Sequence, residues 1–335
     1  MMYFNGSKKN MKKHYNIAVL GPIPRDRITT CKGEVIEKHG GITNPSIALA
    51  IAFGESATVI PVSHVRECDL MPVENILCEY KNIKLDYITA LADQGDINHL
   101  RFVDQNKRLE KQSGFMDPIT PDDVKHILNC DIFVCVPVTD FEITLATLKF
   151  LKKYSKSPII FDAHGPTMTM TALGDRLAKF WVERDAWLPY IDVLKMNMEE
   201  AKCSWFRKRY TLPELENDYE LKVDELPAFA QHCFKFGVKA LYITLDDEGC
   251  LVYYLQNGMV KEERVSAVKV DNVVDTTGCG DSFAGGLAYG LLIGKDYASA
   301  AQYANVFGAQ RTQGSTFEVF KPLAQVEQLV GKNYL

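Results

Sequence analysis

The sequence predicts an α/β fold built on a doubly wound, mostly parallel sheet. Short runs rich in β-branched residues recur along the chain and have the length of buried strands, at 16–20, 57–62, 132–136, 158–161, 191–194 and 240–245. Segments with helical apolar spacing lie between them, at 46–53, 143–154, 173–188 and 226–236. This alternation of strands and helices is typical of a parallel sheet covered by helices on both faces.

Length and composition indicate an ordinary globular protein. The chain has 335 residues, of which 47% are hydrophobic and 24% are charged, close to the averages for globular domains. The formal net charge of −5 gives no reason to expect nucleic acid as a partner, and no apolar run approaches the roughly 20 residues that span a membrane. The nine cysteines form no CxxC pair, which favours free thiols in a reducing compartment, the cytoplasm.

Two segments interrupt the alternation, at 27–39 and 96–113. Polar and apolar residues alternate there without runs of helical length, which predicts a small exposed sheet. The main domain is expected to consist of three stretches, 15–26, 40–95 and 114–335. We expect a flexible tail at 1–14, a surface insertion at 204–222 and two helices rich in small residues at 281–292 and 297–310. Because exposed sheet edges often pair, a homodimer through the small sheet is a further expectation.

The segment 275–281 reads Asp-Thr-Thr-Gly-Cys-Gly-Asp, and it is expected to follow a strand and to open a helix. Gly278 and Gly280 let the backbone turn tightly and approach a ligand with no Cβ in the way. The amides of residues 278–281, that of Cys279 included, would then point out from a helix N-terminus, where anions bind. Fixed N–H groups of this kind stabilise a phosphoryl group in transit, so the segment predicts an anion hole for a γ-phosphate.

Asp281 lies in the first turn of that predicted helix and is the candidate catalytic base. It is placed to take the proton of a substrate hydroxyl aligned with the γ-phosphate, and the alternative is that it only caps the helix. Two other phosphate-binding patterns fail. A GxGxxG motif needs glycine where Phe283 stands, and the stretch 290–296 has three residues between its glycines instead of the four of a P-loop.

With this motif the chain resembles the ribokinase/PfkB family of carbohydrate kinases, whose signature reads Asp-Thr-x-Gly-x-Gly-Asp. Further landmarks follow in the family's order from Asn16 to about Gly314. The resemblance implies a three-layer α/β/α domain on which the small sheet acts as a β lid. It also implies ATP and Mg²⁺ as cofactors and a small sugar-like substrate, whose hydroxyl group receives the γ-phosphoryl group.

The resemblance places substrate-binding residues in the N-terminal part of the chain. Asp26 matches an aspartate that bonds substrate hydroxyls, although an aspartate after prolines is also typical of a turn. Gly40 and Gly41 match a Gly-Gly loop where the substrate passes close to the backbone. Asn44 stands one place earlier than the family's asparagine, and because Pro45 follows it, the alternative is a helix N-cap.

The resemblance places nucleotide-binding residues later in the chain. Asn197 and Glu200 match an Asn-x-x-Glu motif that organises Mg²⁺, often through water, although the same pattern also caps helices. Thr244 and Gly249 match a Thr-x-Gly-x-x-Gly nucleotide segment. Asp246 replaces the first glycine of that segment, and a carboxylate beside phosphates is unfavourable unless it points away or meets a metal.

Members of the family often bind a monovalent cation beside the anion hole. Asp275 and Thr277 match two of its ligands, and the backbone carbonyls of 309–314 are the further source of oxygen atoms. The resemblance therefore implies K⁺ as an additional cofactor. The alternative for Asp275 is a turn-capping role.

The leading hypothesis is an ATP-dependent sugar kinase with Asp281 as base. A nucleoside kinase of the same fold is the alternative within the enzyme class. A catalytically silent ligand-binding relative is the alternative outside it, because Asp246 and the loop 162–166 depart from the family pattern. That loop has the family's aspartate but neither its asparagine nor its arginine, and His164 is interpreted as a polar loop residue.

Overall fold

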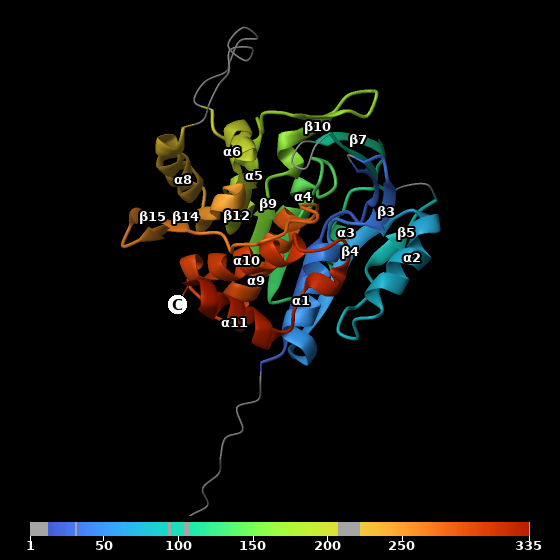
Figure 1. The fold of residues 1–335 in the computed structure, drawn as a ribbon. Coiled ribbons are helices and arrows are strands. Elements are labelled where there is room, and N and C mark those ends of the chain that lie inside the picture. Colours follow the sequence, from blue (N-terminus) through green and yellow to red (C-terminus); the bar gives the residue numbers. More distant parts are fainter. Residues whose placement is uncertain (1–12, 31, 93–94, 104–107, 207–221, 335) are drawn as a thin grey trace, which may run out of the picture.

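The computed structural model describes residues 13–334 except 31, 93–94, 104–107 and 207–221. A large sheet runs through the molecule with helices on both sides, and a smaller sheet lies at one end (Figure 1). Nearly all of the expected N-terminal tail, and most of the expected insertion at 204–222, lie outside the described residues.

The large sheet contains nine strands in the described part of the chain. They are β1 Tyr15–Leu20, β4 Ala57–Val65, β5 Ile88–Ala90, β8 Ile132–Cys135, β9 Ile159–Asp162, β12 Val193–Asn197, β13 Ala240–Thr244, β14 Cys250–Gln256 and β15 Met259–Val265. Their order is β15-β14-β13-β12-β9-β8-β1-β4-β5. Neighbouring strands from β13 to β5 are parallel, and β14 and β15 add an antiparallel hairpin that the sequence pattern did not predict.

Helices cover both faces of this sheet (Figure 1). The helices are α1 Thr43–Phe53, α2 Glu67–Leu77, α3 Pro121–Val124, α4 Leu145–Tyr154, α5 Arg184–Trp187, α6 Met198–Ser204, α8 Leu226–Lys235, α9 Cys279–Leu292, α10 Tyr297–Arg311 and α11 Leu323–Tyr334. One apolar core is formed with α1, α9, α10 and α11, and the other with α4 and α8. The molecule therefore has three layers.

Strand β1 shows why the sheet is covered on both sides. Ile17 and Val19 belong to one core, and Ala18 and Leu20 belong to the other. Successive side chains of a strand point to opposite faces, so a strand that is apolar throughout must be buried on both. The predicted α/β fold with a doubly wound sheet is confirmed.

A separate sheet of four strands has the order β3-β2-β6-β7 in the described residues. Its strands are β2 Arg25–Thr29, β3 Val35–His39, β6 Ile97–Phe102 and β7 Arg108–Gly114. We call this sheet the lid sheet. It comes from the two segments whose alternating pattern predicted a small sheet, and it lies beside the end of β1 because only a short loop separates β1 from β2.

Two sequence expectations are wrong. The segment 173–188 is not one helix, since strands β10 Met168–Met170 and β11 Arg176–Ala178 form a hairpin there and only the short α5 follows. Gly174, with φ 82°, turns the chain within it. The segment before Asp275 is not a strand, because β15 ends at Val265 and irregular backbone follows.

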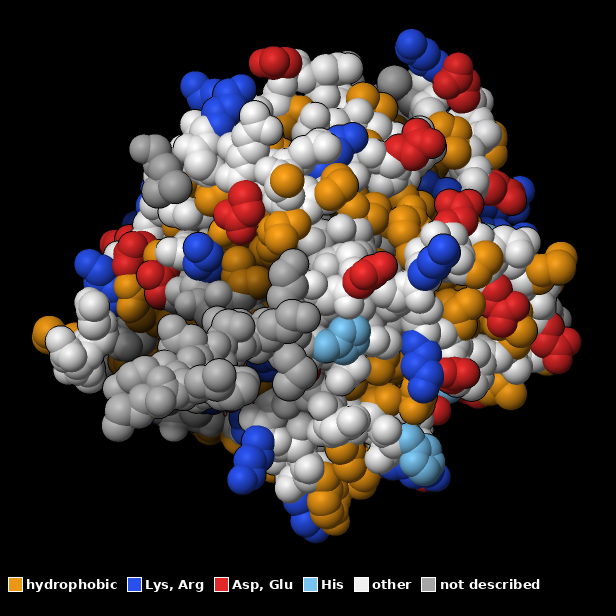
Figure 2. Space-filling model, turned by 90° about the horizontal axis from the view of Figure 1, so that it is seen from below, with side chains coloured by type: hydrophobic (Ala, Val, Ile, Leu, Met, Phe, Trp, Pro, Cys, Tyr) orange, Lys and Arg blue, Asp and Glu red, His pale blue; other side chains and the backbone are white. Residues whose placement is uncertain are grey.

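The surface carries mixed charge. On the face in Figure 2, the described Lys and Arg side chains are interspersed with Asp and Glu and form no continuous basic stripe. Within the described ranges, none of the helices is both long and apolar enough to cross a bilayer.

Candidate active site

The parallel strands of the large sheet end along one edge, and several polar residues meet there. Asp162 ends β9, Asn197 ends β12 and Thr244 ends β13. The strand register pairs Asn197 with Thr244, and Lys195 with Asp162. Helix α9 contacts β8 and β9, and its first turn comes against Lys195 at Gly280. In open α/β sheets this edge is the usual place for a ligand.

Helix α9 begins with the predicted glycine turn. Gly278 has φ 83°, and a Cβ at this position would collide with Asn44 Nδ2, so glycine is required. In the described part of the chain, the N–H groups of Gly278 and Gly280 have no hydrogen-bond acceptor. The Cys279 N–H instead donates to the Thr276 carbonyl at 3.2 Å. The turn thus offers its two glycine amides to a ligand, while it uses the Cys279 amide itself.

The Cys279 thiol has a packing role. Its Sγ lies 3.4 Å from the Gly308 carbonyl oxygen on α10, to which it donates. Burial raises the pKa of the Cys279 thiol to about 11. The side chain therefore stays protonated at neutral pH and joins α9 to α10.

Lys195, in the middle of β12, has a place in the site that the sequence analysis missed. It is 4% exposed, its Nζ donates to Asp162 Oδ2 at 2.7 Å, and Nζ lies 2.9 Å from where a Cβ on Gly280 would stand. Burial by itself would lower the pKa of the Lys195 ammonium, but nearby carboxylates, chiefly that of Asp162, raise it above its ordinary value. Asp281 contributes to the same field. A lysine within a buried apolar strand was the sequence feature that could have revealed it.

Asn197 and Glu200 form a capping box at the start of α6. Asn197 Oδ1 accepts from the Glu200 N–H, and Glu200 Oε2 accepts from the Asn197 N–H, both at 2.8 Å. Glu200 Oε1 also lies 2.8 Å from His164 Nδ1, and His164 Nε2 lies 2.9 Å from Arg176 Nη2. Arginine only donates, so His164 Nε2 accepts from Arg176 and His164 Nδ1 donates to Glu200. His164 is thus part of the site's hydrogen-bond network.

These contacts limit how the expected Mg²⁺ is held. Among the residues that the structure describes, no three or more His, Cys, Asp or Glu side chains are grouped so as to hold a metal ion. Glu200 already accepts hydrogen bonds on both carboxylate oxygens, and Asp162 is paired with Lys195. Asn197 and Glu200 would therefore hold a Mg²⁺ through water, which that ion retains readily.

The loop after β13 keeps its turn despite Asp246. Gly249 has φ 98°, and a Cβ there would collide with the Val265 carbonyl oxygen. Asp246 has φ 48°, a left-handed conformation that aspartate tolerates better than most residues. The Asp246 side chain is exposed. Thr244 Oγ1 donates to the Met196 carbonyl at 3.4 Å, which ties the loop to β12.

The predicted substrate residues Asp26, Gly40 and Gly41 lie together beside the lid sheet. Asp26 is buried on β2, and its Oδ1 accepts from Asn98 Nδ2 on β6 at 3.0 Å. Its other oxygen lies so close to Gly40 that a Cβ there would collide with it. Gly41 has φ 58°, and a Cβ on it would meet the Pro22 carbonyl oxygen. Both glycines are therefore required for this close approach.

Asn44 joins these residues to the start of α9. The alternative of a helix N-cap is wrong, because Ile42 holds that position and Asn44 lies inside the first turn of α1. Asn44 Nδ2 donates to the Gly41 carbonyl at 3.2 Å, and Oδ1 accepts from Arg311 Nε at 3.0 Å. Since the same amide packs against Gly278, it connects the Gly-Gly loop to the glycine turn.

Asp275 meets two cations that the sequence analysis did not assign. Its Oδ1 accepts from the Thr277 N–H at 2.9 Å, and its Oδ2 pairs with Arg311 Nη2 at 3.0 Å and with Lys38 Nζ. Burial by itself would raise the pKa of the Asp275 carboxyl, but Lys38 and Arg311 bring it below its ordinary value. These donors and charges do not fit the expected monovalent cation. Neither basic residue stands in a recognisable local pattern.

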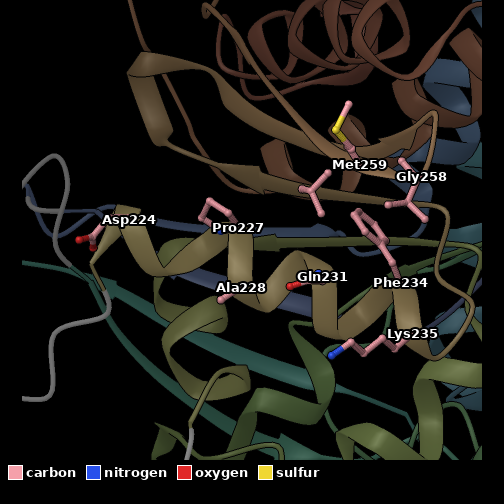
Figure 3. A pocket seen from close by; sticks show the side chains of 10 residues that line it. Asp224, Pro227, Ala228, Gln231, Phe234, Lys235, Gly258 and Met259 are labelled. Atoms are coloured by element: carbon pink, nitrogen blue, oxygen red, sulfur yellow. The ribbon is translucent and has the colours of Figure 1, made fainter.

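A pocket of about 720 Å³ lies elsewhere, between α8 and the β14–β15 hairpin (Figure 3). Gln231 and Phe234 of α8 and Gly258 and Met259 of the hairpin are among its lining residues. None of the residues with a predicted site role lines it. It is separate from the polar edge of the sheet at the start of α9.

Sequence comparisons identify relatives over part of the chain. Residues 160–317 match the model of the pfkB family carbohydrate kinases. An uncharacterized sugar kinase of Archaeoglobus fulgidus is 32% identical over 99 residues, which is 30% of this chain and 38% of that protein. The 2-dehydro-3-deoxygluconokinase of Bacillus subtilis is 38% identical over 84 residues, which is 25% of each chain. The chain thus spans well under half the length of the curated relatives it matches.

Solved structures share the whole fold at low identity. A ribokinase from Arabidopsis thaliana, complexed with ribose and ATP, has a TM-score of 0.70 at 18% identity and covers 95% of this chain and 99% of that chain. A Burkholderia thailandensis nucleoside kinase, complexed with inosine, has a TM-score of 0.69 at 18% identity, with coverages of 95% and 97%. A pyrophosphate-dependent kinase has a TM-score of 0.70 at 16% identity, with coverages of 93% and 99%. The chain therefore matches the pfkB family over residues 160–317 and shares the fold of these ribokinase-family structures over nearly its whole length.

Proposed function

We propose that the protein is an ATP-dependent kinase that transfers the γ-phosphoryl group to a hydroxyl group of a small sugar or sugar-like molecule. One observation supports this most directly. The buried ammonium of Lys195 lies against Gly280 in the first turn of α9, and Asp281 is close enough to affect its pKa. Positive charge and a candidate base therefore stand at one point at the end of the sheet.

The electrostatics of this point favour a phosphate ligand. The N-terminus of a helix carries a partial positive charge, so an ammonium beside it is unfavourable unless negative charge lies near both. The pairing of Lys195 with Asp162 supplies part of that charge within the chain. A phosphoryl group in front of the Gly278 and Gly280 amides would supply the rest, where a buried site strengthens the interaction.

The site residues have different roles in phosphoryl transfer. Asp281 takes the proton from the acceptor hydroxyl, whose oxygen forms a bond to the γ-phosphorus as the bond to the leaving ADP oxygen breaks. The glycine amides and Lys195 stabilise the charge on the equatorial oxygens. Mg²⁺ would neutralise phosphate charge, with Asn197 and Glu200 holding its water ligands. Thr244 and Gly249 border the nucleotide at the next strand end.

The acceptor is proposed to lie between the lid sheet and the glycine turn. Asp26 accepts hydrogen bonds from substrate hydroxyl groups, and Gly40 and Gly41 leave room for the substrate to approach the backbone. Asn44 holds that loop against Gly278. Closure of the lid sheet over the acceptor would exclude water, which otherwise competes as an acceptor.

The experiment that tests this proposal is a screen for ADP release with ATP and Mg²⁺ over sugars, sugar acids, polyols and nucleosides. Turnover with a sugar or sugar acid supports the proposal, in keeping with the names of the two curated relatives. Turnover with nucleosides alone would support the alternative that the Burkholderia neighbour represents. ATP binding without turnover on any acceptor would favour a silent ligand-binding relative.

The identity of the phosphoryl donor is tested separately in the same screen. One structural neighbour is a pyrophosphate-dependent kinase, so pyrophosphate is tested beside ATP on the same acceptors. The amides and Lys195 recognise phosphate groups that both donors contain. Faster product formation with pyrophosphate than with ATP would contradict the ATP part of the proposal.

We also propose a cytoplasmic location and a homodimer formed through the lid sheet. The eight described cysteines are free thiols, which suits a reducing compartment. Strand β3 is an edge of the lid sheet, and its Val35 is 64% exposed. Light scattering on the purified chain and on Val35→Lys would test the dimer, since a charge on the edge opposes pairing.

A further inference from the structure

The Asp275 carboxylate, which opens the segment 275–281, takes its counter-charge from within the chain. Arg311 Nη2 and Lys38 Nζ both contact its Oδ2. Arg311 lies in the last turn of α10 and is 2% exposed, whereas Lys38 lies on β3 of the lid sheet. The two cations thus reach the same oxygen from different parts of the molecule.

The Arg311 guanidinium contacts oxygen atoms from three separate segments. Its Nη2 lies 3.0 Å from Asp275 Oδ2, and its Nη1 donates to the Gly314 carbonyl at 2.6 Å. Its Nε donates to Asn44 Oδ1 at 3.0 Å. A carboxylate, a backbone carbonyl and an amide oxygen around one positive charge are the kinds of ligand that a bound K⁺ would use. Here a guanidinium fills that position.

We propose that Arg311 replaces the expected monovalent cation, so that the start of α9 is assembled without K⁺. A guanidinium has five donors in a fixed plane and cannot dissociate from the chain, so its charge is present at every salt concentration. Arg311 and Lys38 already place two positive charges on Asp275, so a further cation beside them would be repelled. The proposal rests on the proposed kinase function only where activity is the readout.

Arg311 is a positioning residue in this scheme. It holds Asn44, whose amide packs against Gly278, and it holds Asp275, whose other oxygen accepts from the Thr277 N–H. Loss of the guanidinium would release both supports of the glycine turn. The amides of Gly278 and Gly280 would then no longer be fixed in front of the phosphate.

Lys38 has a different part. Its side chain is 17% exposed and belongs to the lid sheet, so its contact with Asp275 changes if the lid moves. Burial lowers the pKa of the Lys38 ammonium, against the opposing effect of Asp275. Arg311 is the permanent cation, and we therefore expect Lys38→Met to remain independent of K⁺.

The test measures thermal unfolding and turnover in KCl, NaCl and choline chloride at equal ionic strength. Wild type is expected to have the same Tm and the same turnover in all three salts. Arg311→Met is expected to lose turnover roughly tenfold to a hundredfold, the scale of a charged hydrogen bond. KCl or low guanidinium chloride, but not choline chloride, should restore part of that turnover and raise the Tm of the variant.

Arg184→Met is the matched control. Arg184 is another buried arginine, which pairs with Asp185 and lies over the Trp205 ring, in a cluster beside α5. Its loss should lower the Tm with no preference among the salts. A structural role alone would give Arg311→Met the same behaviour.

Three results would overturn the inference. A specific response of the wild-type Tm or turnover to K⁺ would show that the chain binds the ion. Equal rescue of Arg311→Met by every salt would show general screening, and retention of full turnover in this variant would remove the positioning role. If Arg311→Met does not fold, Arg311→Lys in the same salts decides, because partial retention of turnover without K⁺ is expected. If wild type has no kinase activity, the proposed function fails while the Tm measurements still decide the cation question.

Discussion

Buried charge is arranged in two ways in this molecule. Around the start of α9 two carboxylates have cationic partners, since Asp162 pairs with Lys195 and Asp275 pairs with Arg311. At the base of the lid sheet, buried Asp96 and buried Glu142 instead lie together, and the nearby Arg176 only partly offsets their charge. Burial raises the pKa of Asp96 to about 6 and that of Glu142 well above its ordinary value.

The two arrangements suit different kinds of charge, which are fixed cations at the start of α9 and an exchangeable proton at the lid base. A phosphate site needs positive charge that stays in place while negative charge moves, and side-chain cations provide it. The base of the lid sheet reaches electrical balance with a proton, because two buried carboxylates cannot both ionise at low cost. A proton exchanges with solvent, so we expect the lid base to respond to pH and the start of α9 to be far less sensitive.

The largest expected effect is on turnover in Asp281→Asn. Asparagine keeps the size of the side chain but cannot take the proton of the acceptor hydroxyl. We expect turnover to fall at least roughly a hundredfold, the usual scale for loss of a general base. Steady-state kinetics on the acceptor found in the screen measures this, and nucleotide binding by calorimetry should change little.

Asp271→Asn is the control for that substitution. Asp271 is exposed and lies ten positions earlier, in the irregular segment before the glycine turn. It loses the same charge without touching the proposed chemistry, so its turnover should match that of wild type. Equal turnover in Asp281→Asn and wild type would remove Asp281 as the base.

Lys195→Met should lower turnover on a similar scale, roughly a hundredfold, because one fixed donor to the transferring group is lost. It should also destabilise the fold by about 3 kcal/mol, since Asp162 would remain buried without its partner. Stopped assays and urea unfolding measure the two effects separately. Without the Lys195 ammonium, the start of α9 would have a buried carboxylate without a paired cation, closer to the arrangement at the lid base.

Lys152→Met is the matched control for Lys195. Lys152 Nζ lies 2.7 Å from Asp192 Oδ2, and Asp192 is also buried. Lys239 remains as a second partner of Asp192, at 2.8 Å, so the loss of stability should be smaller. Turnover should be unchanged. A similar fall in turnover in both variants would mean that Lys195 acts through stability alone.

Gly278→Ala tests the geometry of the turn. Alanine at φ 83° is strained, and its Cβ would collide with the Asn44 amide. We expect a loss of about 1 to 3 kcal/mol in unfolding free energy, the cost of a strained backbone site, and a clear fall in turnover. Gly237→Ala is the control, because Gly237 has φ 103° but no atoms near its missing Cβ. Equal effects of the two substitutions would mean that contact with Asn44 is unimportant.

The sequence was informative wherever the relevant residues are neighbours. Short apolar runs predict the strands, and the glycine turn with Asp281 is one contiguous segment. The wrong prediction of a helix at 173–188 also came from a local pattern. Apolar spacing of helical period also arises when a loop and a separate short helix send side chains into the core, as Trp181 and Trp187 of α5 do here.

The partners of the site residues were beyond reach for a different reason. Arg311 and Asn44 are 267 positions apart, and Lys38 and Asp275 are 237 apart. Only the folded sheet brings such pairs together, and no local pattern of a single sequence records them. Asp26, Gly40 and Gly41 could be named because a family motif marks them, while the cations that support the turn have no motif in this chain.

The smallest expected effect concerns the stability of Glu142→Gln as a function of pH. A carboxyl group whose pKa is raised in the folded state stabilises the fold below its unfolded pKa, and this contribution is lost as pH rises through the folded pKa. Glutamine does not ionise, so the variant escapes that loss. We expect it to exceed wild type in unfolding free energy by on the order of 1 kcal/mol at pH 8, with a smaller gain at pH 5. Urea unfolding at both pH values measures this, with exposed Glu55→Gln as control, and a gain that does not grow with pH would show that the lid base holds no shared proton.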